Sequence, residues 1–262
     1  MKYEFSGETK STDSGVTLHR IRALVDISSA GVKTGDLGGW IEDIRNLSQD
    51  GSCWVGEEAE VYEKASIHGN AIIFDHAKVH GKANVCQDAR VCDDAEVFGK
   101  ALVWDHAYVY ENAKVYGRAS IDEYAHMHGN AEAFENAAIG GDASVTGNAK
   151  IYGDANIGGD GVVIRGNAKV YGNVMILGGE IYDDAEVFGD VHLSGNPYIH
   201  GNAQVYERAE VRDRPHIFDS AKVHGGAHVS DVVYICGNAD ISGNTCLSGM
   251  GRISITVSVH HQ

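Results

Sequence analysis

Four cations recur in this chain at every eighteenth position, and each of them follows an aromatic or imidazole ring by two positions. The cations are Lys64, Lys82, Lys100 and Arg118, and the rings are Tyr62, His80, Phe98 and Tyr116. Cations beside ring faces can hold a small anionic ligand, such as a nucleotide, through charge and stacking. The alternative is structural: the rings shield the corner of a repeat, and the cations neutralise carboxylates of a neighbouring subunit.

A second group of rings and imidazoles crowds into the segment 104–128. Its members are Trp104, His106, Tyr108, Tyr110, Tyr124, His126 and His128. Three pairs among them share the spacing of the cations and are expected to stack directly: Tyr108 with His126, Tyr110 with His128, and His106 with Tyr124. We expect this ring cluster to line a ligand groove between protomers.

Acyl transfer would require a general base that removes a proton from the acceptor, and His126 or His128 is the candidate. No carboxylate that would orient either ring can be identified from the sequence, so outside that alternative we assign no catalytic residue. A metal site was sought among Cys86, Cys92 and His68. The two cysteines fall on different sides of the predicted coil, too far apart for one tetrahedral ion, so no metal is predicted.

A six-residue repeat positions these side chains. Alanine returns every sixth residue from Ala59 to Ala155, and an aliphatic residue almost always follows two places later. Residues two apart share one face of a strand, so both point inward, while Gly, Asn, Asp or Glu occupy the turns. Three hexads, each a strand and a turn, close one triangular coil, and a short fixed period is the signature of a solenoid.

Charges one coil apart in the sequence support this stacking. The position after alanine reads Glu60, Lys78, Glu96, Lys114, Glu132 and Lys150. Coils stacked ~4.8 Å apart would place each cation between two anions. One coil gains a residue around Gly161–Asn167 and the next loses one around Glu180–Asp184. The count from Glu60 predicts about eleven coils, in a rod roughly 50 Å long.

The ends of such a rod need covers, because an open sheet edge invites pairing. Residues 1–46 are predicted to cap it with two strands, Lys2–Thr9 and Val16–Ile27, whose residues Ile21, Ala23, Val25 and Ile27 alternate inward. Residues 47–250 form the solenoid. Residues 251–262 form a C-terminal strand that closes the last coil or pairs with another subunit.

Composition limits the class of protein. The 262 residues include 33 glycines, five cysteines and a formal net charge of −16. The acidic balance disfavours a nucleic-acid polymer as partner. An odd number of cysteines without framework spacing indicates a reducing compartment, and no apolar run approaches a membrane span. We therefore expect a cytoplasmic protein with no membrane partner.

The pattern Ile/Val-x-x-x-Ala-x, over roughly Leu47 to Thr245, resembles the hexapeptide repeat of left-handed β-helix proteins, many of which are trimeric acyltransferases. More narrowly, the opening KYEFSGETK, the strand TLHRIRAL, the turn GDLGGWIE and the GNAKVYG-type hexads resemble an uncharacterised β-solenoid family of bacteria and phages. Its members are often labelled acetyltransferases. The left-handed winding is implied by this resemblance. The loop that breaks the coil and the C-terminal helix of the acyltransferases have no counterpart in this sequence.

These observations predict an all-β protein, a left-handed parallel β-helix with an N-terminal β-hairpin cap. Exposed ring-lined sides favour a homotrimer packed along the rods. The function we expect is non-catalytic binding of a small anionic ligand in grooves between subunits, as in a phage protein that sequesters a host signalling molecule. One alternative is an acyltransferase that uses acetyl-CoA, the only cofactor considered. The other is a purely structural rod.

Overall fold

The computed structural model describes residues 1–254 in full and the main chain of residues 258–261. The chain is nearly all β and forms a parallel β-solenoid of about 12 coils, each about 18 residues long. It divides into two compact units, unit 1 at Met1–Asn130 and unit 2 at Ala131–Gln262. The predicted repeat architecture is therefore confirmed, and the sense of winding stays a prediction.

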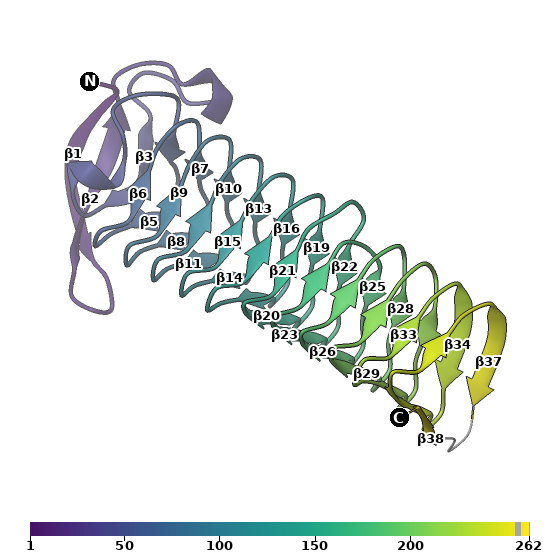
Figure 1. The fold of residues 1–262 in the computed structure, drawn as a ribbon. Helices are drawn as coiled ribbons and strands as arrows, with labels where there is room; N and C mark the ends of the chain where they lie inside the picture. The colour runs from purple at the N-terminus through teal and green to yellow at the C-terminus, as the bar shows by residue number, and fades with distance from the viewer. Residues whose placement is uncertain (255–257, 262) are drawn as a thin grey trace. The chain divides into compact units, whose positions relative to one another are not determined.

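The N-terminal cap is an antiparallel hairpin of β1 (Tyr3–Ser11) and β2 (Thr17–Ala23), at the purple end of the ribbon (Figure 1). Strand β3 (Leu37–Ile41) pairs antiparallel with β2 and parallel with β5 (Glu60–Val61), so it acts as an extra rung. This rung is why the structure has more coils than the predicted eleven. Two 3₁₀ turns, η1 (Ser28–Ala30) and η2 (Ile44–Asn46), complete this region.

The prediction of a second cap strand over Val16–Ile27 was too long. Strand β2 ends at Ala23, and the inward alternation ends there too: Ile21, Ala23 and Ile27 are buried, but Val25 is 44% exposed. The chain bends after β2 because Ala23 bonds to the turn that leads into β3, with its N–H donating to the Asp36 carbonyl at 2.9 Å.

Each coil of unit 1 contributes one strand to each of three faces, which we number in chain order. The first face contains β5 (Glu60–Val61), β8 (Lys78–Val79), β11 (Glu96–Val97) and β14 (Lys114–Val115). The second face contains β6 (Ser66–Ile67), β9 (Asn84–Val85), β12 (Leu102–Val103) and β15 (Ser120–Ile121). The third face contains β4 (Trp54–Val55), β7 (Ile72–Ile73), β10 (Arg90–Val91), β13 (Tyr108–Val109) and β16 (His126–Met127).

Unit 2 repeats the three faces. Its first face contains β17 (Glu132–Ala133), β20 (Lys150–Gly153), β23 (Lys169–Gly172), β26 (Glu186–Gly189), β29 (Gln204–Glu207), β32 (Lys222–Val223), β35 (Asp240–Gly243) and β38 (Ser258–His261). Its second face contains β18 (Ala138–Ile139), β21 (Asn156–Ile157), β24 (Met175–Ile176), β27 (His192–Leu193), β30 (Glu210–Val211), β33 (His228–Val229) and β36 (Cys246–Leu247). Its third face contains β19 (Ser144–Val145), β22 (Val163–Ile164), β25 (Glu180–Ile181), β28 (Tyr198–Ile199), β31 (His216–Ile217), β34 (Val232–Cys236) and β37 (Met250–Ser254).

The C-terminal segment continues these sheets. Strand β37 pairs parallel with β34, and β38 pairs parallel with β35. The sequence had left open whether this segment closes the last coil or pairs with another subunit, and β37 closes the last coil. Residues 255–257 and Gln262 of this predicted strand lie outside the described residues.

The core is a dry stack of small residues. The alanine that opens each hexad and the aliphatic residue two places later are both buried in coil after coil, as in Ala95 and Val97. The register between coils is strict: Glu96 pairs with Lys114 and Val97 with Val115, and the Lys114 ammonium lies 3.3 Å from the Glu96 carboxylate. The predicted stacking of equivalent residues in successive coils is confirmed by these pairs.

Acidic side chains stabilise the turns. A residue with positive φ opens each turn, and in many coils it is Asp or Glu rather than glycine. Its carboxylate then accepts the backbone N–H of the equivalent residue in the next coil, as Asp93 accepts from Glu111 at 2.9 Å and Asp219 accepts from Gly237 at 2.9 Å. Charge-assisted bonds of this kind offset the cost of left-handed backbone, which accounts for much of the acidity of the chain.

The two departures from the regular repeat lie earlier than predicted. Ala138 pairs with Asn156, but Ser144 pairs with Val163, so the added residue falls between Ile157 and Val163. The missing residue falls between Ile176 and Glu180, because Asn156 pairs with Met175 but Val163 pairs with Glu180. Both lie in glycine-rich turns, where a changed length leaves the inward alternation of the strands intact. No helix among the described residues has the length and apolar character that a bilayer crossing requires.

Candidate functional site

The four predicted cations line one groove of unit 1. We call Lys64, Lys82, Lys100 and Arg118 the cation column; they stand at the corner between the first and second faces, one per coil. The groove has a volume of about 1030 Å³, and its lining also includes Arg45, Glu42 and Glu63.

The cation column is unpaired within the described part of the chain. All four side chains are exposed, and none makes an ion pair within 4.0 Å with a described residue. Equivalent residues of stacked coils lie ~4.8 Å apart. Two like charges at ~5 Å in water repel by about 0.8 kcal/mol, so the column costs stability unless a counter-charge is present.

Glycine forms the floor of the groove. Gly81, Gly99 and Gly117 precede the last three cations and have φ of 73°, 73° and 72°. At the same turn position, the other two corners of unit 1 mostly carry acids or an amide, for example Asp93 and Asp105, also with positive φ. A Cβ on Gly99 would lie 2.9 Å from the Gly117 nitrogen, so the floor is close-packed main chain. Over these three coils the cationic corner therefore lacks the carboxylates that the other corners use.

The end of the groove next to the cap is mixed in charge. Arg45 of η2 is held by Asp43, with its Nε 2.8 Å from Oδ1, and this ion pair keeps the pKa of the Asp43 carboxyl below its usual value through its hydrogen bonds to Arg45. Glu42 accepts the N–H of Glu63 at 2.5 Å. The carboxylates at this end repel an anion, so an anion would bind more readily at Lys82, Lys100 and Arg118.

The rings beside the cation column stack on one another. Tyr62, His80, Phe98 and Tyr116 follow each other with centroid separations of 4.9, 5.1 and 4.8 Å and interplanar angles of 5° or less. Both faces of His80 and of Phe98 are thus covered by neighbouring rings. Burial raises the pKa of Tyr62 to about 12. A ligand therefore cannot stack on His80 or Phe98. The cation column can bind a ligand through charge.

The second predicted group, the ring cluster, is also brought together, on the second and third faces of unit 1. His106 stacks on Tyr124 at 4.8 Å, and Tyr110 stacks on His128 at 4.7 Å, as predicted. Trp104 donates its indole N–H to Ser120 at 3.2 Å. Tyr124 is 61% exposed, so its ring is open to solvent.

The third predicted stack, Tyr108 on His126, was wrong in geometry. Their Cα atoms are partners, but the rings meet edge to face, 5.9 Å apart at 64°. The Tyr108 hydroxyl accepts a bond from the Cys92 thiol at 3.2 Å, and its ring leans on Tyr110 at 4.6 Å. These two contacts tilt the ring away from the parallel orientation.

A shallower cleft of about 470 Å³ opens beside the ring cluster. Its lining consists of Asp88, Arg90, His106, Tyr108 and His126. Arg90 was missed by the sequence reasoning, although its place exactly one coil before Tyr108 could have revealed it. His106 and His128 have carboxylates near their Nδ1 atoms, Asp88 at 4.0 Å and Glu111 at 3.7 Å. The sequence had identified no such partner.

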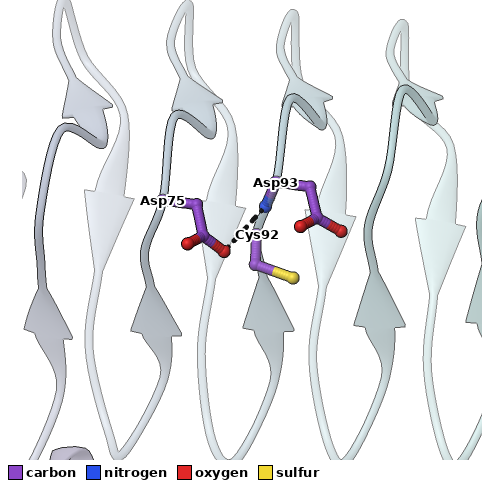
Figure 2. A group of neighbouring side chains, drawn as sticks. All are labelled: Asp75, Cys92 and Asp93. Carbon is purple, nitrogen blue, oxygen red and sulfur yellow. Dashed lines mark hydrogen bonds between the residues drawn. The ribbon is translucent and has the colours of Figure 1, made fainter.

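Three groups with metal-ligand chemistry meet on the third face. The ligand atoms of Asp75, Cys92 and Asp93 lie within 4.8 Å of one another (Figure 2). Asp75 already accepts the Asp93 N–H at 3.2 Å, and burial raises the pKa of the Cys92 thiol to about 11. The thiol is therefore protonated near neutral pH, and an ion would have to displace that proton to bind it. Cys86 lies on another face, as predicted.

Comparison with the models of known protein families found no match, and comparison with curated proteins found none either. The function of the grooves is therefore argued from their residues alone.

Proposed function

We propose that this chain is a non-catalytic binding protein whose cation column holds a small anionic ligand. The observation that carries the proposal is the groove itself: four cations without an ion-pair partner among the described residues line about 1030 Å³ over a floor of glycine. Repulsion between the neighbouring cations lowers the stability of the fold, and a bound anion would offset that repulsion. The groove is also open enough for a small molecule.

A phosphorylated ligand fits this chemistry best. Lysine binds phosphate as a point charge, and arginine adds a planar fork that can donate two parallel bonds. The nucleotide expected from the sequence belongs to this class. A phage-borne member of the β-solenoid family that the sequence resembles could use such a groove to sequester a host signalling nucleotide.

Calorimetry tests the proposal. Tripolyphosphate, a nucleoside triphosphate and orthophosphate would be titrated into the wild type and into Lys82→Gln/Lys100→Gln, without divalent cations. We expect heat with the wild type and a Kd at least 30-fold weaker in the variant. Lys78→Gln/Lys222→Gln is the matched control, because it removes two exposed lysines outside the groove. No heat with any anion, or equal losses in both variants, would refute the proposal and favour a purely structural protein.

One observation favours the second candidate function, acyl transfer. Glu111 lies 3.7 Å from His128 Nδ1, which is the kind of orienting contact that a general base uses. His126, the other candidate, lines the shallower cleft beside Arg90. A thermal shift of several degrees with acetyl-CoA, lost in His128→Gln, would support this function. The absence of a shift would remove it.

We also propose that copies of this chain associate, as the predicted homotrimer, through the second face of unit 2. Met175 and Leu177 are 44% and 47% exposed there, and the neighbouring outward residue Asn156 carries no charge. Copies with a net charge of −16 repel one another least where charge is absent. Native mass spectrometry should find trimers for the wild type and monomers for Met175→Glu/Leu177→Glu. A monomeric wild type would contradict this.

A further inference from the structure

We infer that the ligand of the cation column is a short linear phosphate chain that lies along the stack of coils and is recognised by its length. This inference rests on the proposed function and narrows its ligand class. A nucleotide would bind here through its phosphates, with its base outside the groove.

The spacing of the charges is the first argument. The column places one cation per coil at a single corner, so its four members span three coil steps, or ~14 Å. A compact anion such as orthophosphate can reach about two neighbouring side chains. A chain of linked phosphates can meet all four, since lysine stems are flexible and the Arg118 fork can take a terminal phosphate with two bonds.

The floor of the groove is the second argument. At Gly81, Gly99 and Gly117 no side chain projects, so a thin chain can lie directly over the main chain. The backbone amides there are already used between coils: the N–H groups of Lys82 and Lys100 donate to the carbonyls of Gly99 and Gly117 at 2.6 and 2.7 Å. Contacts to the ligand must therefore come from the side chains of the cation column. These side chains form a line of positive charges and would bind negative charges spaced along the same line.

The neighbouring rings supply the third argument. His80 and Phe98 are covered on both faces by stacked rings, so a base finds no free face on them. Readout of a base normally needs such a face or a set of hydrogen-bond partners for its edge. Recognition at this corner is accordingly indifferent to the identity of the base.

Charge also limits the length of the ligand. Glu42 and Glu63 stand at the cap end of the groove, and the chain as a whole carries −16. A long polyanion would run off the column onto acidic surface and be repelled. The column is therefore suited to a chain with about four negative charges, such as tripolyphosphate or tetrapolyphosphate.

The test is a chain-length series by calorimetry in low salt without divalent cations. The ligands are orthophosphate, pyrophosphate, tripolyphosphate, tetrapolyphosphate and a long polyphosphate. We expect the Kd to fall by about tenfold for each phosphate that meets a further cation, up to about four phosphates, and to rise again for the long polyphosphate, which extends onto acidic surface. ATP, GTP and CTP should bind within about threefold of one another.

Variants place the ligand along the column. Arg118→Gln should weaken tetrapolyphosphate by about tenfold but leave pyrophosphate within twofold, because the shorter ligand can bind elsewhere on the column. Anions that bind with the same Kd at every length, or nucleotides that differ by more than tenfold with their base, would overturn this inference and leave the proposed function standing. If no phosphate compound binds at all, the proposed function fails as well.

Discussion

The corner between the first and second faces has a similar backbone in both units, but its first four side chains in unit 2 differ in chemistry from the four cations of unit 1. In unit 1 it carries the cation column above Gly81, Gly99 and Gly117. In unit 2 the first four equivalent positions are Asn136, Asp154, Asn173 and Asp190, again with glycines such as Gly153 and Gly172 in the turns, and the remaining positions are Arg208, Gly226 and Asn244.

At this corner of unit 2, amide and carboxylate side chains of neighbouring coils form hydrogen bonds with each other. The Asn136 amide donates to Asp154 at 2.8 Å, and the Asn173 amide donates to Asp190 at 3.1 Å. The cations of unit 1 have no such partner among the described residues. The side chains at these positions of unit 2 are thus paired within the stack, whereas the cations of unit 1 are unpaired there, and under the proposed function an anion binds them. The repeat therefore sets where a side chain stands, while the type of that side chain decides whether it pairs within the stack.

The largest effect is expected when the unit 2 chemistry is moved into unit 1. In Lys82→Asn/Lys100→Asp the introduced amide can donate to the introduced carboxylate, as Asn136 does to Asp154. Two cations are lost and an anion is added, so the Kd for tripolyphosphate should rise by more than 100-fold. Differential scanning calorimetry should find a Tm equal to or above that of the wild type. A variant that still binds tripolyphosphate would contradict the comparison.

A second contrast lies between thiols. Cys92 of unit 1 is buried, and burial raises its pKa from 9.0 to about 11, whereas Cys246 of unit 2 is exposed. At pH 8 the Cys92 thiolate should be about 100-fold scarcer than in an ordinary thiol, so iodoacetamide should label Cys246 first by mass spectrometry.

The sign of the pH effect follows from the raised pKa. The folded state favours the neutral Cys92 thiol, so its contribution is present below pH 9 and is lost as the pH rises to about 11. The free energy of unfolding should therefore fall by at most about 3 kcal/mol over this range, relative to Cys92→Ala. Equal labelling of both cysteines at pH 8 would show that Cys92 is open to solvent.

A smaller effect is expected from the floor of the groove. Gly99→Asp gives this corner the acid that Asp93 provides elsewhere in unit 1, with all four cations kept. The carboxylate should weaken tripolyphosphate by about tenfold, and left-handed backbone together with the close approach of the new Cβ to Gly117 should cost more than about 1 kcal/mol of stability. Gly225→Asp in unit 2 is the control, since Gly225 has φ of 72° at the equivalent turn position. It should lose similar stability without any change in binding.

The smallest effect is expected from removing one of the side-chain hydrogen bonds that stabilise this corner of unit 2. Asn173→Ala removes the bond to Asp190 and should lower the free energy of unfolding by about 1 kcal/mol. Urea denaturation measures this change, and tripolyphosphate binding should be unaffected. If Lys82→Ala destabilised the fold as much as Asn173→Ala, the cations would be structural too.

The repeat made most of the fold predictable, because its period alone is enough to place Glu96 beside Lys114 and each member of the cation column beside the next. Details set by contacts between side chains were not predictable. Tyr108 tilts because of the Cys92 thiol, and the carboxylate bonds of the turns depend on positive φ at Asp and Glu. The added and missing residues were placed too late in the chain because glycine-rich turns hide where a register changes.

The most direct test of the central claim is diffraction from crystals of the wild type soaked in tripolyphosphate. We predict density for the ligand over Gly81, Gly99 and Gly117 in unit 1, within hydrogen-bonding distance of Lys82, Lys100 and Arg118, and none over the Asn136–Asp190 corner of unit 2. Density at neither corner at a concentration that gives heat in solution, or equal density at both, would contradict the account.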